Sequence, residues 1–306
     1  MSKPVCLLWL DDFEAYKTAL ADAGLADRFE LHHVKREDTP PDELIPRVEI
    51  LAGWKHGKLL ARMPKLRWIQ AMTAGVEAWI DAPGLRDEVM LCCARGSHRH
   101  SMSENILGAL FHLTKPYMAA ALDQKQGQWN RRMSKLLAGQ TLGILGLGRI
   151  GEEIAARAKA FKMNIRYHNR NKKDVPYPYD PDVVTLAKNC DVLVAITPGG
   201  PETKGIVNAA VLDALGPQGY FVNVARGSVV DQPVLLKYLQ DKKIAGAGLD
   251  VYYDEPDVDP AFFELDNAVL LPHMASATNE TRTAMGGLQI ENILLHLSGK
   301  PVKTPV

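Results

Sequence analysis

Short apolar runs alternate with amphipathic stretches along the first third of the chain. The apolar runs have the length of single β-strands, and the stretches between them place apolar residues at helical spacing. This alternation is typical of βαβ units built around a parallel sheet. The predicted strands are residues 5–10, 30–34, 48–52, 68–72 and 89–93, and the predicted helices are residues 13–23 and 42–48. We therefore expect a small α/β layer in this part of the chain.

A second series of the same kind begins at Gly139. Its predicted strands are residues 141–145, 164–168, 192–195, 220–223, 246–250 and 268–271. Six strands suit a complete dinucleotide-binding sheet. Residues 174–181 contain three prolines, which interrupt helices and central strands alike, so this segment is predicted to be a surface loop.

Two long helices connect and complete these layers. Ser101 and Glu104 have the spacing of a capping box and precede apolar residues at helical spacing, which predicts a helix from Ser101 onward. A final helix is predicted between Pro272 and about Leu297. Because the second sheet is already complete, this helix is expected to fold back on the first layer. The predicted fold class is α/β, with two Rossmann-like or flavodoxin-like domains: residues 1–99 with 280–306, and an inserted domain of residues 100–279.

Composition fits two folded domains and excludes a disordered chain. The 306 residues are 46% hydrophobic, enough for two cores at roughly 150 residues per domain. Lys plus Arg and Asp plus Glu are both 36, so no net charge attracts the chain to nucleic acid or to an anionic membrane. No apolar stretch approaches the roughly 18 residues of a membrane span. Four cysteines give no disulfide framework, so a cytoplasmic location is expected.

A glycine-rich turn follows the first strand of the second series. Gly146, Gly148 and Gly151 form G-x-G-x-x-G between this strand and an amphipathic helix. The first glycine permits a tight turn, the second allows a pyrophosphate to approach the backbone, and the third allows close packing of helix and strand. In this context the turn predicts a dinucleotide cofactor.

The end of the next strand indicates which dinucleotide is preferred. An Asp or Glu is expected there for NAD, but the sequence has Asn169 and Arg170, followed by Lys172 and Lys173. Asn169 can donate to a 2′-phosphate and Arg170 can pair with it in bidentate fashion. These contacts predict a preference for NADP(H) over NAD(H) of about tenfold to a hundredfold. A solvated basic turn without a ligand remains the alternative.

Three further polar side chains follow strands of the second sheet. Arg226, Glu255 and His273 each come shortly after a predicted strand, and ligands of open α/β sheets bind beyond the carboxyl ends of the strands. A guanidinium can hold a carboxylate, an imidazole can exchange a proton, and a carboxylate can orient that imidazole. Together they predict a catalytic set.

At these residues the sequence resembles the D-2-hydroxyacid dehydrogenase family. The family has Arg in a strand-end A-R-G, Glu five residues past an L-D-V aspartate, and His in P-H-x-x-S-A-T, which match Arg226, Glu255 and His273. The resemblance is densest over residues 139–278. It implies a dimeric NAD(P) enzyme with a split substrate-binding domain and an inserted cofactor domain.

The resemblance also implies a reaction. Arg226 would bind the substrate carboxylate and polarise the C2 carbonyl, His273 would protonate the carbonyl oxygen, and Glu255 would keep His273 protonated. The implied activity is NADPH-dependent reduction of a small 2-oxo acid, such as glyoxylate, hydroxypyruvate or an aryl pyruvate, to a D-2-hydroxy acid. A homodimer is expected, built around the helix after Ser101 and the segment near Trp129. No nucleic acid, membrane or metal is expected as a partner.

Further binding residues follow from the same resemblance. Backbone N–H groups of Ala74, Gly75 and Val76 would help to hold the substrate carboxylate. Trp54 could cap a small 2-oxo acid or stack on an aromatic one, although a core tryptophan is an equal alternative. The other implied cofactor contacts are Arg149, Ile150, Thr197, Pro198, Val224, Ala225, Asp250, His273 and Ala275.

Some features depart from the family pattern. Residues 197–203 read T-P-G-G-P-E-T where the family often has L-T-P-E-T, so this loop is expected to differ in shape. Residues 97–100 are basic and could touch substrate or a hinge, but a solvated turn is favoured. A zinc site of Cys92, Cys93, His98 and His100 is disfavoured because adjacent cysteines lack C-x-x-C spacing.

Two alternative functions stay open. Formate dehydrogenases share the Arg and the His but usually carry Gln in place of Glu255, which argues against that chemistry. A nucleotide-sensing corepressor or scaffold protein also resembles this family, and a fold does not settle a function.

Overall fold

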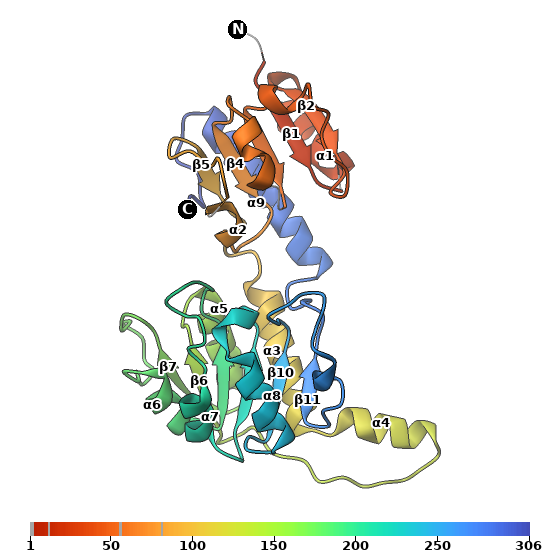
Figure 1. The fold of residues 1–306 in the computed structure, drawn as a ribbon, viewed down its shortest axis with the longest axis vertical. Helices are drawn as coiled ribbons and strands as arrows, with labels where there is room; N and C mark the ends of the chain where they lie inside the picture. The colour runs from red at the N-terminus through yellow and green to blue at the C-terminus, as the bar shows by residue number, and fades with distance from the viewer. Residues whose placement is uncertain (1–2, 12, 55–56, 81) are drawn as a thin grey trace. The chain divides into compact units, whose positions relative to one another are not determined.

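The computed structural model describes residues 3–11, 13–54, 57–80 and 82–306 (Figure 1). The chain forms two compact units, one of residues 1–97 and 278–306 and the other of residues 98–277. These boundaries lie two residues before the predicted ones at 99 and 279. Each unit contains one parallel sheet.

The first unit has a five-stranded parallel sheet in the order β2-β1-β3-β4-β5. Its strands are β1 (Val5–Trp9), β2 (Glu30–Val34), β3 (Ile50–Gly53), β4 (Trp68–Ala71) and β5 (Met90–Cys92). Alternate residues of β1 enter two hydrophobic clusters, with Leu7 and Trp9 in one and Cys6 and Leu8 in the other. The continuous apolar runs of the sequence therefore reflect a sheet that is covered on both faces.

Among its described residues, the first unit has three α-helices: α1 (Phe13–Asp22), α2 (Glu77–Ile80) and α9 (Asn279–Leu297). Tyr16 of α1 and Ile293 of α9 share one hydrophobic cluster, so the C-terminal helix packs on the first sheet. The remaining helical turns are 3-10: η1 (Ala26–Arg28), η2 (Ile45–Arg47) and η3 (Gly57–Arg62). The helix predicted at residues 42–48 is wrong, because only η2 forms there and Pro46 lacks the N–H that a longer helix needs.

The second unit has a six-stranded parallel sheet in the order β11-β10-β9-β8-β6-β7. Because β6 lies between β7 and β8, the strand order reverses beside β6, where α/β proteins bind dinucleotides. The strands are β6 (Thr141–Leu145), β7 (Asn164–His168), β8 (Val192–Ala195), β9 (Tyr220–Asn223), β10 (Gly246–Leu249) and β11 (Ala268–Leu270).

The proline-rich segment 174–181 is more than a surface loop. Tyr179 forms a parallel bridge with Tyr167 of β7. The N–H of Tyr167 donates to the carbonyl of Pro178 at 3.1 Å, and the N–H of Asp180 donates to the carbonyl of Tyr167 at 2.8 Å. The segment therefore covers the β7 edge of the sheet, and prolines are tolerated at an edge because one side of an edge strand makes no ladder.

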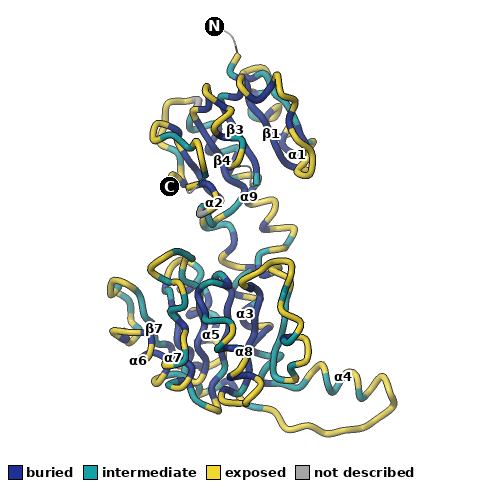
Figure 2. Tube along the Cα trace, in the orientation of Figure 1, coloured by how far each residue is buried: buried dark blue, intermediate teal, exposed yellow. Residues whose placement is uncertain are grey.

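Helices pack around the second sheet (Figure 1), and the buried residues gather in the middle of this unit (Figure 2). The helices are α3 (Arg99–Thr114), α4 (Tyr117–Lys125), α5 (Arg149–Ala160), α6 (Val183–Lys188), α7 (Ala209–Leu215) and α8 (Gln232–Gln240), with 3-10 turns η4 (Gly227–Val229) and η5 (Pro260–Phe262). The predicted capping box is wrong: α3 begins at Arg99, and Ser101 and Ser103 lie inside it. The Ser103 hydroxyl donates to the carbonyl of His100 at 2.7 Å.

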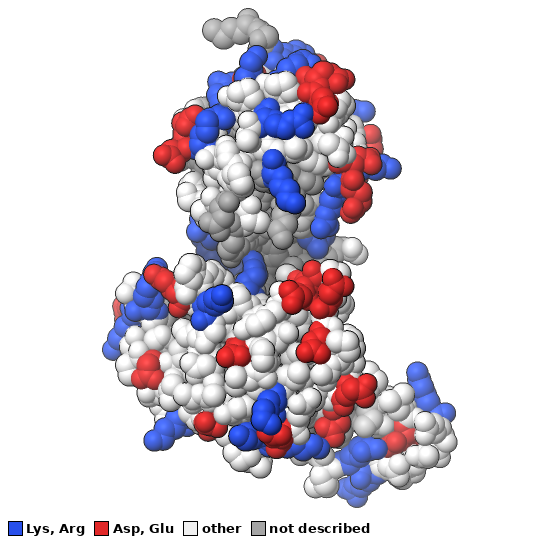
Figure 3. Space-filling model, in the orientation of Figure 1, with Lys and Arg blue, Asp and Glu red and all other residues white. Residues whose placement is uncertain are grey.

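The surface carries both signs of charge. On the face shown in Figure 3, acidic and basic side chains are interspersed over each unit, in keeping with equal numbers of the two. None of the helices in the described ranges is long and apolar enough to cross a membrane.

Candidate active site

The glycine-rich turn has one glycine that the fold itself does not require. Gly146 has φ of +103°, and a Cβ on it would lie 2.8 Å from the N atom of Thr197. A Cβ on Gly151 would lie 2.6 Å from the carbonyl oxygen of Gly146. A Cβ on Gly148 would meet nothing within 4 Å. The space at Gly148, at the N-terminus of α5, therefore fits a pyrophosphate that approaches the backbone.

Two of the basic side chains that follow β7, Arg170 and Lys173, already have partners. Arg170 Nη1 lies 2.9 Å from Oε2 of Glu202, and both side chains are exposed. Lys173 Nζ pairs with Glu152 and donates to the carbonyl of Leu147 at 3.1 Å. Asn169 Oδ1 accepts from the N–H of Leu147 at 2.6 Å, which ties this turn to the glycine-rich turn. The residues present fit a dinucleotide cofactor.

Arg226, Glu255 and His273 follow three neighbouring strands, β9, β10 and β11, at the same edge of the second sheet. His273 Nδ1 lies 2.7 Å from Oε2 of Glu255. Oε1 of Glu255 accepts from the N–H of Tyr252 at 2.9 Å, so both carboxylate oxygens are engaged. Glu255 thereby orients the imidazole, and Nε2 is the nitrogen left for a reacting group. The structure places these two predicted residues in direct contact, and their catalytic roles stay a prediction.

The backbone at His273 is unusual. Its φ is +50°, in the left-handed region that few residues other than glycine adopt. Half of the imidazole surface is exposed. A strained but accessible histidine is typical of a functional position.

Two side chains hold the loop after His273 in place. Both carboxylate oxygens of Asp250 accept backbone N–H groups, from Met274 at 2.8 Å and from Ala275 at 2.9 Å. Burial raises the pKa of Asp250, and the two N–H groups oppose this shift. The buried hydroxyl of Ser101 donates to the carbonyl of Ala275 at 2.6 Å. From sequence, Asp250 is predicted to contact the cofactor and Ser101 to cap a helix. Neither anchoring role could be predicted, because no local sequence pattern indicates hydrogen bonds between residues so far apart in the chain.

Hydrogen bonds to neighbouring residues hold Arg226 at the end of β9. Its Nη1 donates to the carbonyl of Ala225 at 2.7 Å, and Asn223 Nδ2 donates to the carbonyl of Arg226 at 3.1 Å. A Cβ on Gly199 would lie 2.8 Å from Cγ of Arg226, so the side chain of Arg226 packs directly against the Gly199 backbone. Gly199 in the 197–203 loop thus makes room for the arginine stem.

The other predicted cofactor residues lie around these turns. Arg149 and Pro198 are exposed, and Ile150 and Thr197 are half-buried. Val224, Ala225 and Ala275 are each 4% exposed, so they would offer backbone rather than side-chain atoms to a ligand.

The other predicted substrate residues, Trp54 and residues 74–76, lie in the first unit. Ala74 is exposed and Gly75 and Val76 are half-buried, in the loop between β4 and α2. Among the described residues, none accepts a hydrogen bond from the backbone N–H groups of these three. Consecutive N–H groups of this kind can bind an anion. Trp54 directly follows β3 and is half-buried, so it is not a fully buried core residue.

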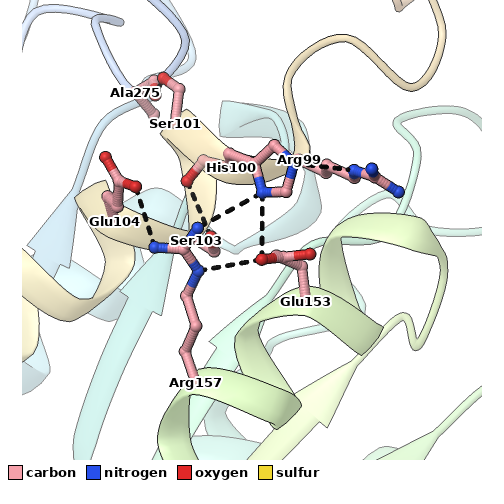
Figure 4. Close-up of polar contacts among 8 residues, drawn as sticks. All are labelled: Arg99, His100, Ser101, Ser103, Glu104, Glu153, Arg157 and Ala275. Carbon is pink, nitrogen blue, oxygen red and sulfur yellow. Dashed lines mark hydrogen bonds and ion pairs between the residues drawn. The ribbon is translucent and has the colours of Figure 1, made fainter.

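The basic segment 97–100 opens a polar network between α3 and α5 (Figure 4). His100 Nδ1 lies 3.1 Å from Oε1 of Glu153, and Arg157 reaches Glu153 at 3.0 Å and Glu104 at 2.9 Å. These contacts give the segment a structural role in joining two helices. In the part of the chain that the structure describes, no three His, Cys, Asp or Glu side chains gather closely enough to hold a metal.

Comparisons with known proteins identify the family of this chain. The family described as D-isomer specific 2-hydroxyacid dehydrogenase, NAD binding domain, matches residues 107–275. Hydroxyphenylpyruvate reductase from Plectranthus scutellarioides is 46% identical over 268 residues, which cover 86% of this chain and 80% of the relative. Glyoxylate/hydroxypyruvate reductase A from Arabidopsis thaliana is 36% identical over 254 residues, with 81% of each protein covered.

A solved structure supports the same assignment. NADPH-dependent glyoxylate/hydroxypyruvate reductase from Sinorhizobium meliloti, in complex with NADP and malonate, matches with a TM-score of 0.85 and 32% identity, over 100% of this chain and 97% of the other. The family match spans more than half of the chain, and the two relatives above cover most of it. The chain therefore belongs to the D-isomer-specific 2-hydroxyacid dehydrogenase family.

Proposed function

We propose that this oxidoreductase reduces a small 2-oxo acid to a D-2-hydroxy acid with NADPH. The observation that carries the proposal is the His273–Glu255 pair at 2.7 Å. Glu255 follows β10 and His273 follows β11, and β10 is the neighbour of β9, which Arg226 follows. The named relatives are reductases of glyoxylate, hydroxypyruvate and hydroxyphenylpyruvate, which supports this substrate class. Nothing among them supports the alternative of a nucleotide-sensing or scaffold protein.

The residues act on a carbonyl in complementary ways. The guanidinium of Arg226 binds the substrate carboxylate and polarises the adjacent C2 carbonyl. Nε2 of His273 donates its proton to the carbonyl oxygen, and the Glu255 carboxylate orients the imidazole through Nδ1. The nicotinamide cofactor supplies the hydride when it is bound. In the reverse direction His273 acts as the base.

The two units take different roles in this proposal. The second unit binds NADP(H) through the turn at Gly146, Gly148 and Gly151. The first unit contributes to substrate binding through the N–H groups of residues 74–76. A cytoplasmic location fits the four cysteines, which are all free thiols.

A direct assay tests the function. Purified protein is mixed with NADPH or NADH and with glyoxylate, hydroxypyruvate, pyruvate, phenylpyruvate or 4-hydroxyphenylpyruvate, and cofactor oxidation is followed by absorbance. Turnover of any of these acids supports the proposal. Tight cofactor binding without turnover of any of them would contradict it and would favour a sensing role.

The preference for NADPH should depend on Arg170. Arg170→Ser should lower the ratio of kcat/KM for NADPH to that for NADH by about tenfold to a hundredfold, because a charged hydrogen bond to the 2′-phosphate is lost. Glu202→Gln should raise the ratio slightly, since the exposed pair with Arg170 that competes with the phosphate is worth about 0–1 kcal/mol. Lys237→Ser is the control, because Lys237 pairs with Asp241 on α8. An unchanged ratio in Arg170→Ser would show that the basic turn is only solvated surface.

We further propose that the protein is a homodimer, formed through α4 and the segment that follows it. This part of the second unit extends away from its sheet and is exposed (Figures 1 and 2). Six large apolar side chains are exposed here: Tyr117, Met118, Leu122, Trp129, Met133 and Leu136. Such a concentration of exposed apolar side chains indicates an interface.

Light scattering during size-exclusion chromatography should give the mass of two chains. Leu122→Glu should shift the protein toward one chain, because it places a charge among these apolar groups. The exposed Val184→Glu on α6 is the control. A wild-type mass of one chain at all concentrations would contradict the proposal.

A further inference from the structure

Both backbone polar groups of Leu147 are bonded to side chains of the turn that follows β7. Leu147 lies between Gly146 and Gly148 in the glycine-rich turn and is fully buried. Its N–H donates to Oδ1 of Asn169 at 2.6 Å, and its carbonyl accepts from Nζ of Lys173 at 3.1 Å. Nδ2 of Asn169 lies 3.5 Å from the same carbonyl oxygen. The turn after β7 therefore fixes the orientation of the peptide groups on both sides of Leu147.

The backbone of Lys173 is held by the sheet. The hydroxyl of Tyr167 accepts from the N–H of Lys173 at 2.9 Å and donates to its carbonyl at 3.0 Å. Tyr167 belongs to β7 and is fully buried. The start of the Lys173 side chain is therefore set by the sheet, and only its own rotamers have to be ordered for Nζ to reach Leu147.

Lys173 also balances a carboxylate in the first turn of α5. Its Nζ pairs with Glu152, and the N–H of Glu152 donates to the carbonyl of Gly148 at 2.8 Å. Among the described residues, no side chain caps α5 at Gly148, so the first N–H groups of this helix suit an anion. An unbalanced carboxylate in this turn would repel a pyrophosphate. The pair with Lys173 offsets that repulsion.

The surroundings of Arg170 are different. The Arg170 side chain is 80% exposed, and its partner Glu202 is 76% exposed. The Lys173 side chain is 36% exposed and is bonded to the glycine-rich turn. An exposed ion pair is weak, so Arg170 can exchange Glu202 for another anion at little cost. The two cations therefore suit different parts of a dinucleotide.

We propose that Lys173 is a positioning residue for the pyrophosphate site, where it holds the carbonyl of Leu147 and balances Glu152, and that it does not bind the 2′-phosphate. The inference rests on the cofactor binding of the proposed function and divides the basic turn into two roles. Arg170 discriminates NADPH from NADH. Lys173, together with Asn169, sets the shape and charge of the glycine-rich turn for both cofactors alike. Loss of Lys173 leaves the carbonyl of the buried Leu147 without its charged donor.

Two fragments of NADPH separate these roles. ADP-ribose contains the pyrophosphate but no 2′-phosphate, and 2′-AMP contains the 2′-phosphate but no pyrophosphate. Each is titrated into the protein and its dissociation constant is measured by calorimetry. Lys173→Gln should weaken the binding of ADP-ribose about tenfold and leave that of 2′-AMP within about twofold, because only the pyrophosphate site is altered. Arg170→Ser should show the reverse pattern.

The whole cofactors should give the same separation. In Lys173→Gln the dissociation constants of NADPH and NADH should rise by the same factor, about tenfold, so that their ratio is unchanged. Lys173→Arg keeps the charge and the donors, so it should bind ADP-ribose within about threefold of the wild type.

Lys188→Gln is the charge-matched control. Lys188 is exposed in the last turn of α6. This helix leads into the amino end of β8, so Lys188 lies toward the edge of the sheet opposite to the glycine-rich turn. The variant should leave the affinities for both fragments unchanged.

Three results would overturn the inference. Equal weakening of 2′-AMP and ADP-ribose in Lys173→Gln would mean that the lysine binds the 2′-phosphate. An unchanged affinity for ADP-ribose would mean that Lys173 forms only a surface ion pair. An equal loss in Lys188→Gln would indicate a general effect of charge. None of these titrations involves turnover, so the expected fragment pattern in a protein that reduces no 2-oxo acid would support the positioning role and contradict the proposed reduction.

Discussion

His273→Asn should lower kcat for 2-oxo acid reduction by about a thousandfold or more, because general acid catalysis by a positioned side chain contributes about 10²–10⁴ and asparagine has no imidazole to pair with Glu255. Asparagine is the replacement of choice because it tolerates the φ of +50° at this position. The affinity for NADPH, measured by fluorescence titration, should change little. The expected loss is therefore in chemistry, and the protein should stay folded.

A second histidine–glutamate pair supplies the control for that experiment. His100 and Glu153 are 3.1 Å apart, and His100 is 57% exposed compared with 50% for His273. His100 is on α3, however, and follows no strand of the sheet. His100→Asn should keep kcat within about twofold. Near-normal turnover in His273→Asn would remove this residue from the role of acid.

Gly227→Ala should produce the largest loss of stability among simple glycine replacements. A Cβ at this position would lie 1.9 Å from the carbonyl oxygen of Tyr252 and 2.5 Å from the N atom of Tyr253. These are backbone atoms, so the chain itself must shift. We expect the free energy of unfolding to fall by about 3 kcal/mol, measured by urea denaturation. Activity should fall as well, because the N–H of Tyr252 holds Glu255.

Gly148→Ala is the matched contrast. Its Cβ would meet nothing within 4 Å, and φ at Gly148 is −88°. Its free energy of unfolding should stay within about 0.5 kcal/mol of the wild type. The affinity for NADPH should fall at least about tenfold, because the methyl group would occupy the space of the pyrophosphate. Equal stability of both variants would show that the Gly227 contact relaxes without cost.

Most strands could be predicted from sequence because their signal is local. A strand covered on both faces is a continuous apolar run, as in β1 and β8. Such a run can be recognised in the sequence even when the neighbouring strands in the sheet are not known. The glycine-rich turn was predictable for the same reason. Arg226, Glu255 and His273 could be grouped because parallel strands bring their carboxyl ends to one edge.

Features that depend on distant partners could not be predicted. The serines of α3 have the spacing of a cap, but Ser101 instead bonds to Ala275, far along the sequence. Asp250 anchors the loop after His273 for a similar reason. Lys173 likewise bonds to Leu147 and Glu152, which precede it by 26 and 21 residues, so no short sequence window contains these contacts.

The single bridge at Tyr179 has a consequence for solubility. An open parallel sheet presents unpaired N–H and carbonyl groups at its outer strand, and these can recruit a strand from another molecule. In the second unit, β7 would be such a strand, but the 174–181 segment lies along it. Pro176, Pro178 and Pro181 have no N–H to offer, so this covering segment cannot extend the ladder to a neighbouring chain. The prolines thereby protect this side of the sheet against edge-to-edge aggregation.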